Sequence, residues 1–260
     1  MPKFAANLTM LFTELPFLER FAAAAQAGFK AVEFLFPYDH EPVTIHAALQ
    51  ANHLSLVLHN LPAGNWAGGE RGIACAPERI SEFREGVAKA ISYAQALNCP
   101  QLNCLAGIVA PENATIAHTT LVENLGFAAA ALQKAGLILL LEPVNTQDIP
   151  GFFVNRSAQA LAIINEVSAP NLKLQYDIYH AQIMEGNLSR TIETNLAAIG
   201  HIQLADNPGR HEPGTGEINY HYLFKKLDTL GYAGWIGCEY KPKSTTQAGL
   251  GWLAAHHITL

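Results

Sequence analysis

Eight short apolar segments alternate with helical patterns along the 260 residues of this chain. Several of them, such as AVEFLF and LILLLEPV, are apolar at both odd and even positions, which is typical of parallel strands covered on both faces. A strand followed by a helix, repeated eight times at this length, favours a closed parallel barrel. The predicted strands cover residues 4–11, 31–36, 54–61, 101–106, 137–144, 172–176, 201–205 and 235–238.

The segments between the strands carry helical stripes with recognisable ends. Phe17, Phe21 and Ala25 share one helical face, and Gly28 closes that helix. An open doubly wound sheet is the alternative fold, but no GxGxxG motif follows the first strand. No linker or break in composition suggests a second domain. We therefore predict the α/β class, with one (β/α)8 TIM barrel domain over residues 1–260.

The composition limits the partners of such a barrel. Apolar residues make up 50% of the chain and charged residues only 15%, which excludes an intrinsically disordered protein. The 22 acidic residues exceed the 16 basic ones and give a formal net charge of −6. No cluster of lysine and arginine resembles a surface that tracks nucleic-acid phosphates. We predict a small-molecule partner and no nucleic acid.

The sequence shows no signal for export or membrane insertion. An acid and a proline interrupt its first residues before a signal-peptide core, and the longest aliphatic run, Leu137–Leu141, is too short to cross a bilayer. The cysteines at 75, 99, 104 and 238 have no CxxC spacing, so we expect buried, reduced thiols. We predict a cytoplasmic protein without a membrane partner. An oligomer is compatible with the sequence, which shows no dimer signature.

Polar side chains stand at the ends of the last four predicted strands. They are Glu142, Asp177, His180, Gln203 and Glu239. Active sites of parallel barrels form at the C-terminal ends of the strands, so these side chains are expected to converge on one arc of the barrel mouth.

Three acids in an apolar setting do not all stay ionised without compensation, and a divalent cation would supply it. Carboxylate and amide oxygens suit Mg²⁺ or Mn²⁺ better than zinc. Taken alone, each acid is more often a solvated or salt-bridged group than a ligand, and Gln203 is also explained as a hydrogen-bonded amide of the barrel interior. The joint pattern favours a metal site.

Six stretches of the chain carry a more specific signal: FAANLTMLFTE, VEFLFPYD, LHNLPAGNWAGGERGIA, YDIYHAQIMEGNL, HIQLADNPGRHEPGTGEINY and GWIGCEYKP. They resemble the hydroxypyruvate isomerase family, which includes the similar 2-oxo-tetronate isomerases, and the resemblance covers nearly the whole chain. It implies a xylose-isomerase-like barrel. It also implies a metal site made of Glu142, Asp177, Gln203 and Glu239, with Glu142 and Glu239 doubling as the acid/base pair.

The resulting hypothesis is a metal-dependent isomerase of small 2-oxo-3-hydroxy acids. It would convert hydroxypyruvate to tartronate semialdehyde, or a 2-oxo-tetronate to its 3-oxo isomer, by proton transfer through a cis-enediolate. One glutamate removes a proton and the other returns one to the next carbon; their order stays open, as does the choice between a three-carbon and a four-carbon substrate.

Five further residues are predicted to contact the substrate. His180 would hydrogen-bond the developing oxygen charge. Arg210 or Arg71, from the loops after the seventh and third strands, would hold the substrate carboxylate, with Arg210 slightly favoured. His59 and Trp66 would close the pocket. An ordinary surface arginine and a loop-anchoring tryptophan are the alternatives.

Three rival functions stay open at this stage. A sugar 3-epimerase would use the same barrel, but such enzymes usually have a histidine where this chain has Gln203. A barrel that binds a small acid without turnover is the second rival, since fold does not imply function. An apurinic endonuclease resembles the chain in fold, but it needs many clustered histidines and a surface for DNA phosphates, and the eleven histidines here are dispersed.

Overall fold

A computed structural model describes residues 2–256, 258 and 260 of the protein. Its centre is a closed barrel of eight parallel strands, in which each strand pairs with the next and β8 closes on β1. This confirms the predicted (β/α)8 barrel. The strands are β1 (Lys3–Asn7), β2 (Ala31–Glu33), β3 (Ser55–Asn60), β4 (Gln101–Cys104), β5 (Ile138–Leu141), β6 (Leu172–Asp177), β7 (Ile199–Leu204) and β8 (Trp235–Cys238).

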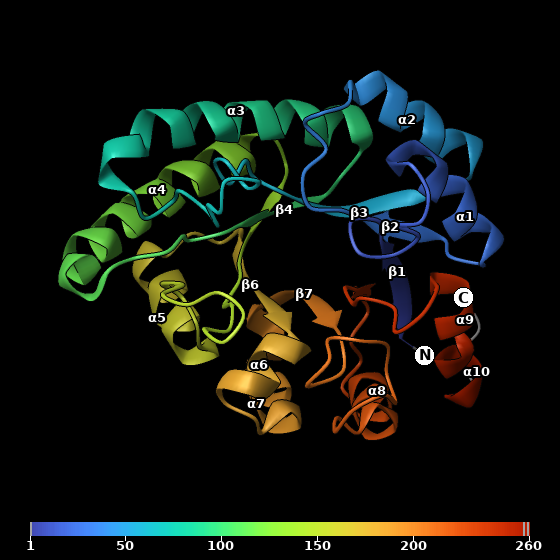
Figure 1. The fold of residues 1–260 in the computed structure, drawn as a ribbon. Coiled ribbons are helices and arrows are strands. Elements are labelled where there is room, and N and C mark those ends of the chain that lie inside the picture. Colours follow the sequence, from blue (N-terminus) through green and yellow to red (C-terminus); the bar gives the residue numbers. More distant parts are fainter. Residues whose placement is uncertain (1, 257, 259) are drawn as a thin grey trace.

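Helices surround the barrel, with α3 and α4 on the side opposite α6, α7 and α8 (Figure 1). The α-helices are α1 (Arg20–Gln26), α2 (Pro42–Ala51), α3 (Ile80–Leu97), α4 (Ala114–Lys134), α5 (Ser157–Val167), α6 (Ile178–Met184), α7 (Leu188–Asn195), α8 (Tyr220–Thr229), α9 (Thr246–Gly249) and α10 (Gly251–Ala255). Short 3-10 helices occupy Phe17–Glu19, Pro77–Arg79, Pro111–Asn113 and Leu196–Ala198. None of the helices in the described part of the chain is long and apolar enough to span a membrane.

Most strands are shorter than their apolar segments. The first ends at Asn7, where the side-chain Oδ1 accepts a hydrogen bond from the backbone N–H of Thr9 (3.0 Å) and turns the chain. Leu8 and Leu11 nevertheless stay fully buried, because the loops at this end fold back over the core. The apolar pattern therefore marks burial beyond the strand itself, and the predicted strand over 4–11 was too long.

Strand register brings the polar strand ends to one level. Asp177 of β6 pairs with Gln203 of β7, and Gln203 pairs with Gly237 of β8. Glu142 directly follows β5, and Glu239 lies two residues after Gly237. Four of the predicted site residues thus stand at the same end of the barrel. The four cysteines are free and buried, as predicted.

Candidate active site

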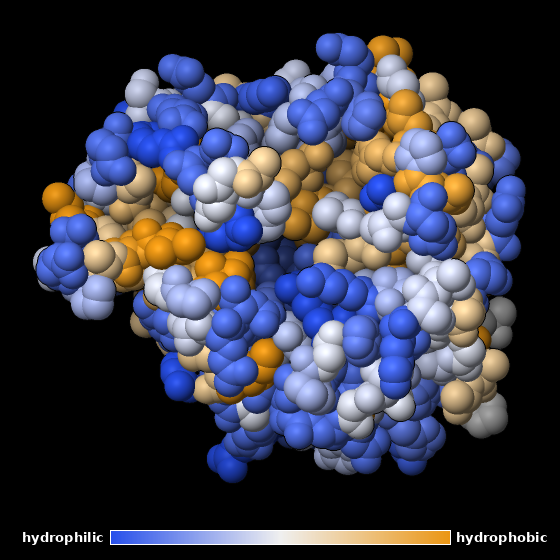
Figure 2. Space-filling model, in the orientation of Figure 1, coloured by the Kyte–Doolittle hydropathy of each residue, from blue (hydrophilic) through white to orange (hydrophobic). Residues whose placement is uncertain are grey.

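A cavity of about 570 Å³ opens at the C-terminal mouth of the barrel. Its lining includes Glu142, His180, Arg210 and Glu239 from the β5 to β8 side, and Asp148 from the loop after β5. The space-filling view shows a hollow near the centre of this side of the molecule, with hydrophilic residues at its floor (Figure 2). The site is therefore a polar recess at the mouth of the barrel.

Two carboxylates line this cavity with little exposure, 5% for Glu142 and 6% for Glu239. A third, Asp177, is 2% exposed and contacts the lining residues His180 and Arg210. Burial and the nearby charge of Asp177 raise the pKa of Glu142 to about 8, although Asn103 donates to its Oε2 (2.6 Å). Burial also raises the pKa of Asp177 and of Glu239, and the charge of Arg210 opposes both shifts. The acids share a site in which negative charge is unfavourable without a cation.

His180 enters this cluster as a neutral donor. Asn145 accepts two backbone N–H bonds at its Oδ1, from Gln147 and Asp148, so its side-chain NH2 faces His180 Nδ1 at 2.7 Å. Nδ1 must then accept, which leaves the proton on Nε2. That nitrogen lies 3.5 Å from Asp177 Oδ2 and 3.9 Å from Glu142 Oε1. Burial holds the pKa of His180 well below its usual range.

Arg210 supplies the positive charge of the site. Its guanidinium lies 3.5 Å from Glu239 Oε2, 3.8 Å from Asp177 Oδ2 and 5.1 Å from the centre of the Tyr179 ring. Burial on its own lowers the pKa of Arg210, but the charges of Glu239 and Asp177 outweigh it and raise the pKa above its usual value. When the three carboxylates are ionised, they outnumber the single guanidinium that lies against them.

The loop that carries Arg210 is organised by one buried carboxylate. Asp206 accepts backbone N–H bonds from Asn207 and Ile218 at Oδ1, and from Gly214 and Gly216 at Oδ2, at 2.8–3.1 Å. Arg210 itself has φ +53°, a left-handed conformation that an arginine adopts only where its surroundings fix it. The loop therefore presents the guanidinium in a fixed position.

The donor set fits a divalent cation. Glu142, Asp177 and His180 each offer an atom within 4.8 Å of the other two. The Oδ2 of Asp177 is buried and has no hydrogen-bond partner among the described residues. Because His180 Nε2 carries a proton, we assign the ligand role to carboxylate oxygens, which Mg²⁺ and Mn²⁺ prefer. A cation would also offset the repulsion among these carboxylates.

Gln203 lies just below the cavity lining, in the barrel interior. Its amide Nε2 donates to Glu33 Oε1 (2.8 Å), and its Oε1 accepts from Gln175 Nε2 (2.6 Å). A carbonyl oxygen has two lone pairs, so one acceptor position is left for a cation. Its place in the ligand set stays a prediction.

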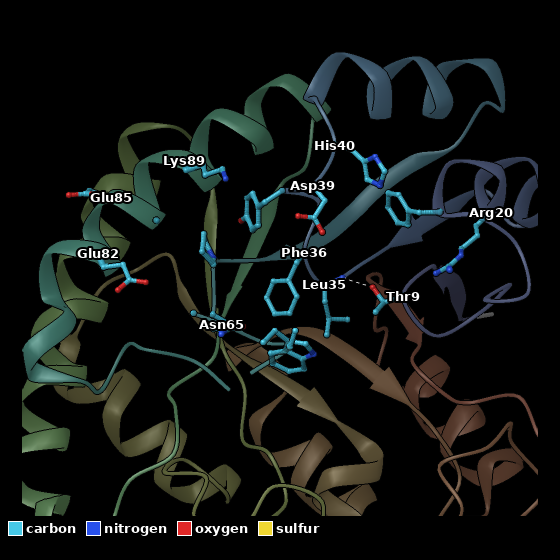
Figure 3. A pocket seen from close by; sticks show the side chains of 18 residues that line it. Thr9, Arg20, Leu35, Phe36, Asp39, His40, Asn65, Glu82, Glu85 and Lys89 are labelled. Atoms are coloured by element: carbon cyan, nitrogen blue, oxygen red, sulfur yellow. Dashed lines mark hydrogen bonds between the residues drawn. The ribbon is translucent and has the colours of Figure 1, made fainter. Parts of the chain in front are cut away.

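Trp66 and Arg71 reach the cavity from the opposite side, in the loop after β3. The Arg71 guanidinium stacks 4.3 Å over the Trp66 ring, which packs on Phe36 at 4.9 Å. Trp66 and Leu35 also line a second cavity of about 780 Å³ between α3 and the β1 to β3 loops. Phe36, Asn65 and Leu35 lie at its centre, and Lys89, Glu82 and Glu85 come from α3 (Figure 3). Trp66 is thus a wall shared by two cavities.

His59 does not line the catalytic cavity. It is fully buried in β3, stacked on Phe34 at 6.5 Å, and its Nδ1 lies 3.2 Å from the Asn60 carbonyl oxygen. The next residue, Asn60, lines the cavity instead, because successive strand residues point to opposite faces. Burial lowers the pKa of His59 to about 4.

The buried His59 predicts a loss of stability in acid. The unfolded histidine takes up a proton below pH 6.5, whereas the folded one does so only near pH 4. The resulting loss in the free energy of unfolding is therefore absent above pH 6.5 and grows as the pH falls to 4. It reaches about 3 kcal/mol for a difference of about 2.5 pKa units between the folded and the unfolded histidine. Urea unfolding of wild type and His59→Gln at pH 7 and pH 4 measures it. An equal loss of unfolding free energy in both proteins would contradict this assignment.

Several residues of the site could not be predicted from the polar residues at the ends of the apolar segments. Glu33 lies inside the segment predicted as a strand over 31–36, and Asn103 lies inside 101–106. Asp148 and Asn145 belong to the loop after β5. Hydrogen bonds to Glu142, His180 and Gln203 identify Asn103, Asn145 and Glu33 as parts of the site. Asp148 is identified by its place in the cavity lining.

The chain is similar to proteins of known name over nearly all of its length. A model of the xylose isomerase-like TIM barrel family matches residues 21–256. Hydroxypyruvate isomerase of Escherichia coli (strain K12) is 56% identical over 254 residues, with 97% of this chain and 98% of that protein covered. The 2-oxo-tetronate isomerase of Cupriavidus necator is 51% identical over 255 residues, with 97% and 98% covered.

A solved structure described as AP endonuclease, family 2, from Brucella melitensis has a TM-score of 0.96 and 47% identity, covering 98% of this chain and 99% of that one. The family match and the identities to curated isomerases agree with the acids assembled at the barrel mouth. The chain therefore belongs to the hydroxypyruvate isomerase family of the xylose isomerase-like TIM barrels, and it is an isomerase.

Proposed function

We propose that the protein is a metal-dependent isomerase of small 2-oxo-3-hydroxy acids that works in the cytoplasm. The observation that carries the proposal is the group of three buried carboxylates beside one half-buried guanidinium and a neutral histidine at the mouth of the barrel. Glu142, Asp177 and Glu239 would hold the cation, with the Gln203 carbonyl oxygen as a fourth ligand. The four free, buried cysteines suit a reducing compartment.

The bound Mg²⁺ or Mn²⁺ would act as a Lewis acid that polarises the substrate carbonyl and makes the neighbouring C–H more acidic. The protein residues then move the proton. A carboxylate whose pKa is raised toward neutral pH is a stronger base, and Glu142 has this property. Glu239, across the same cavity, would act on the adjacent carbon of the cis-enediolate.

The remaining side chains orient the substrate. The Nε2–H of His180 faces the acidic cluster and would donate to an enediolate oxygen, since its position is fixed by Asn145. Arg210 and Arg71 lie on different walls of the cavity, and either can hold a carboxylate through two parallel bonds. We assign this contact to Arg210, whose guanidinium is fixed in the site, with Arg71 at the rim.

Replacement of Arg210 by lysine is expected to raise KM for the acid substrate and to lower kcat/KM by about 10- to 100-fold, the value of one or two charged hydrogen bonds. Arg71→Lys is the matched variant from the opposite wall, and we expect a smaller effect there. Steady-state kinetics of both proteins with hydroxypyruvate gives the comparison. A larger loss in Arg71→Lys would transfer the carboxylate contact to Arg71.

The substrate is tested by turnover of hydroxypyruvate and of 2-oxo-tetronates side by side. A curated relative carries each of these activities in its name, and one extra carbon in a pocket changes the free energy by only about 1–3 kcal/mol. We expect turnover of at least one of these acids, with loss of its 2-keto signal. An absence of turnover with all of them, in the presence of Mg²⁺ or Mn²⁺, would overturn the proposal.

The name of the Brucella melitensis structure raises endonuclease activity as a second candidate. The formal net charge of −6 and the acids of the cavity disfavour DNA phosphates. We expect no binding of an abasic duplex in a salt titration. Tight binding whose affinity falls steeply with salt would favour the endonuclease.

A further inference from the structure

A second buried polar cluster lies beneath the cavity, centred on Glu33 at the end of β2. Glu33 is 0% exposed and lies in the barrel interior. Its Oε1 accepts from Asn7 Nδ2 (2.9 Å) and from Gln203 Nε2 (2.8 Å), and its Oε2 lies 2.7 Å from His201 Nε2. Four strands, β1, β2, β7 and β6 through Gln175, contribute to this cluster.

The barrel is built to accommodate this carboxylate. A Cβ atom added at Gly237 of β8 would lie 2.3 Å from both carboxylate oxygens of Glu33. No side chain fits there, so the glycine leaves the space that the carboxylate occupies. Glu33 is absent from the lining of the catalytic cavity, so its effect on the site must pass through its neighbours.

The contacts of Glu33 determine which way the Gln203 amide points. Asn7 is fixed first, because its Oδ1 accepts from Thr9 N–H and its NH2 must therefore face Glu33. The Oε1 of Glu33 thus acts as an acceptor, and Gln203 must present Nε2 to it. The carbonyl oxygen of Gln203 is then directed the other way, toward β6.

The orientation passes on to the catalytic acids. Gln175 Nε2 donates to the Gln203 carbonyl at 2.6 Å, and Gln175 also lowers the pKa of Glu142, against the larger effect of burial. In this series of hydrogen bonds, the direction of the Asn7 amide determines that of Gln203, and Gln203 in turn determines that of Gln175. A reversed Gln203 amide would present NH2 groups to each other and an NH2 group to any cation.

We propose that Glu33 is a positioning residue of the active site. It fixes the Gln203 amide so that the carbonyl oxygen points toward β6 and the proposed metal site. The inference rests on the proposed function, because the fixed oxygen is the fourth ligand proposed there. This role requires only that Glu33 place an acceptor oxygen within hydrogen-bond distance of Gln203 Nε2. It requires neither contact between Glu33 and the substrate nor a change in the protonation of Glu33.

Three variants separate acceptor geometry from charge and volume. Glu33→Gln keeps one acceptor oxygen toward Asn7 and Gln203, and its NH2 can face His201 if that ring carries its proton on Nδ1. Glu33→Met keeps the volume but removes the acceptor. Glu33→Asp keeps a carboxylate but places it one methylene farther from Gln203. His201→Gln is the control that disturbs the other oxygen of Glu33 and leaves the Gln203 bond in place.

The readout is the Kd for Mn²⁺, measured by calorimetry on protein whose fold is checked by circular dichroism. Loss of a group that orients a metal ligand typically weakens metal binding about 10- to 100-fold. We expect a loss of this size for Glu33→Met and Glu33→Asp. For Glu33→Gln and His201→Gln we expect a Kd within about threefold of the wild-type value. If Glu33→Met does not fold, Glu33→Asp carries the test alone. Wild-type affinity in folded Glu33→Asp, or an equal loss in Glu33→Gln, would overturn the inference.

A second readout separates this inference from the metal site itself. If wild type binds no Mn²⁺, the metal part of the proposed function fails, and the orientation is then followed by NMR through hydrogen exchange of the Gln203 side-chain NH2. We expect slow exchange in wild type and Glu33→Gln, and fast exchange in Glu33→Asp. Slow exchange in all three would show that Glu33 does not hold the amide.

Discussion

Replacement of Glu142 by glutamine is expected to lower kcat by about 10²- to 10⁴-fold, the usual contribution of a general base. The change keeps the shape of the side chain and its contact with Asn103, but it removes the proton acceptor whose pKa burial raises to about 8. Proton exchange between substrate and solvent should fall in parallel. Proton NMR of substrate in D₂O, with kcat from the loss of the keto signal, measures both quantities.

Two comparisons make this result specific. Glu239→Gln should show a similar loss, because both glutamates serve the proton transfer. Glu112→Gln changes an exposed glutamate outside the cavity and should leave kcat unchanged. Circular dichroism and thermal unfolding of all three proteins exclude a loss of fold. Wild-type exchange in folded Glu142→Gln would refute its role as a base.

Removal of metal is the second large effect. Chelator-treated protein should lose turnover by about 10²- to 10³-fold, because Lewis-acid stabilisation of the developing charge contributes several kcal/mol. Addition of Mg²⁺ or Mn²⁺ should restore activity, since the three carboxylates and the Gln203 oxygen form a set of oxygen donors. Kinetics before and after chelation, with the metal content measured by elemental analysis, gives the result.

The same cation should stabilise the fold, because it binds the folded site and not the dispersed carboxylates of the unfolded chain. The melting temperature of the metal-free protein should therefore rise with Mn²⁺ concentration. Asp177→Asn is expected to lose this rise, because Asp177 Oδ2 is a buried carboxylate oxygen that accepts no hydrogen bond from the described residues. Full activity in protein shown to contain no metal would remove the cation from the mechanism.

The fold followed closely from the sequence because its signal is local and repeated. Each strand needs only its own apolar residues, and eight alternations of strand and helix in a chain of this length specify the barrel. The ends of the strands were predicted less well. Leu8 and Leu11 are apolar because the loop over the core buries them, so hydropathy extends past the turn that Asn7 makes.

The acids of the site were also accessible from the sequence, since Glu142, Asp177 and Glu239 each end an apolar segment. Glu33 was not, because its partners are far away along the chain: His201 is 168 residues distant and Gln203 is 170. A short-range pattern holds no information about such contacts. The prediction for His59 was wrong for a similar reason. Whether the side chain of a strand residue points toward the cavity depends on the strand register, and only the closed barrel defines that register.

The fate of the transferred hydrogen tests the account most directly. Hydroxypyruvate is converted by wild-type protein with Mg²⁺ or Mn²⁺ in D₂O, and the product is examined by NMR at C2, the carbon that receives hydrogen. In the proposed mechanism one glutamate removes the proton from C3 and the other delivers one at C2, so solvent deuterium should appear at C2. Full retention of substrate protium at C2 would indicate a hydride shift within the substrate and would contradict proton transfer through an enediolate.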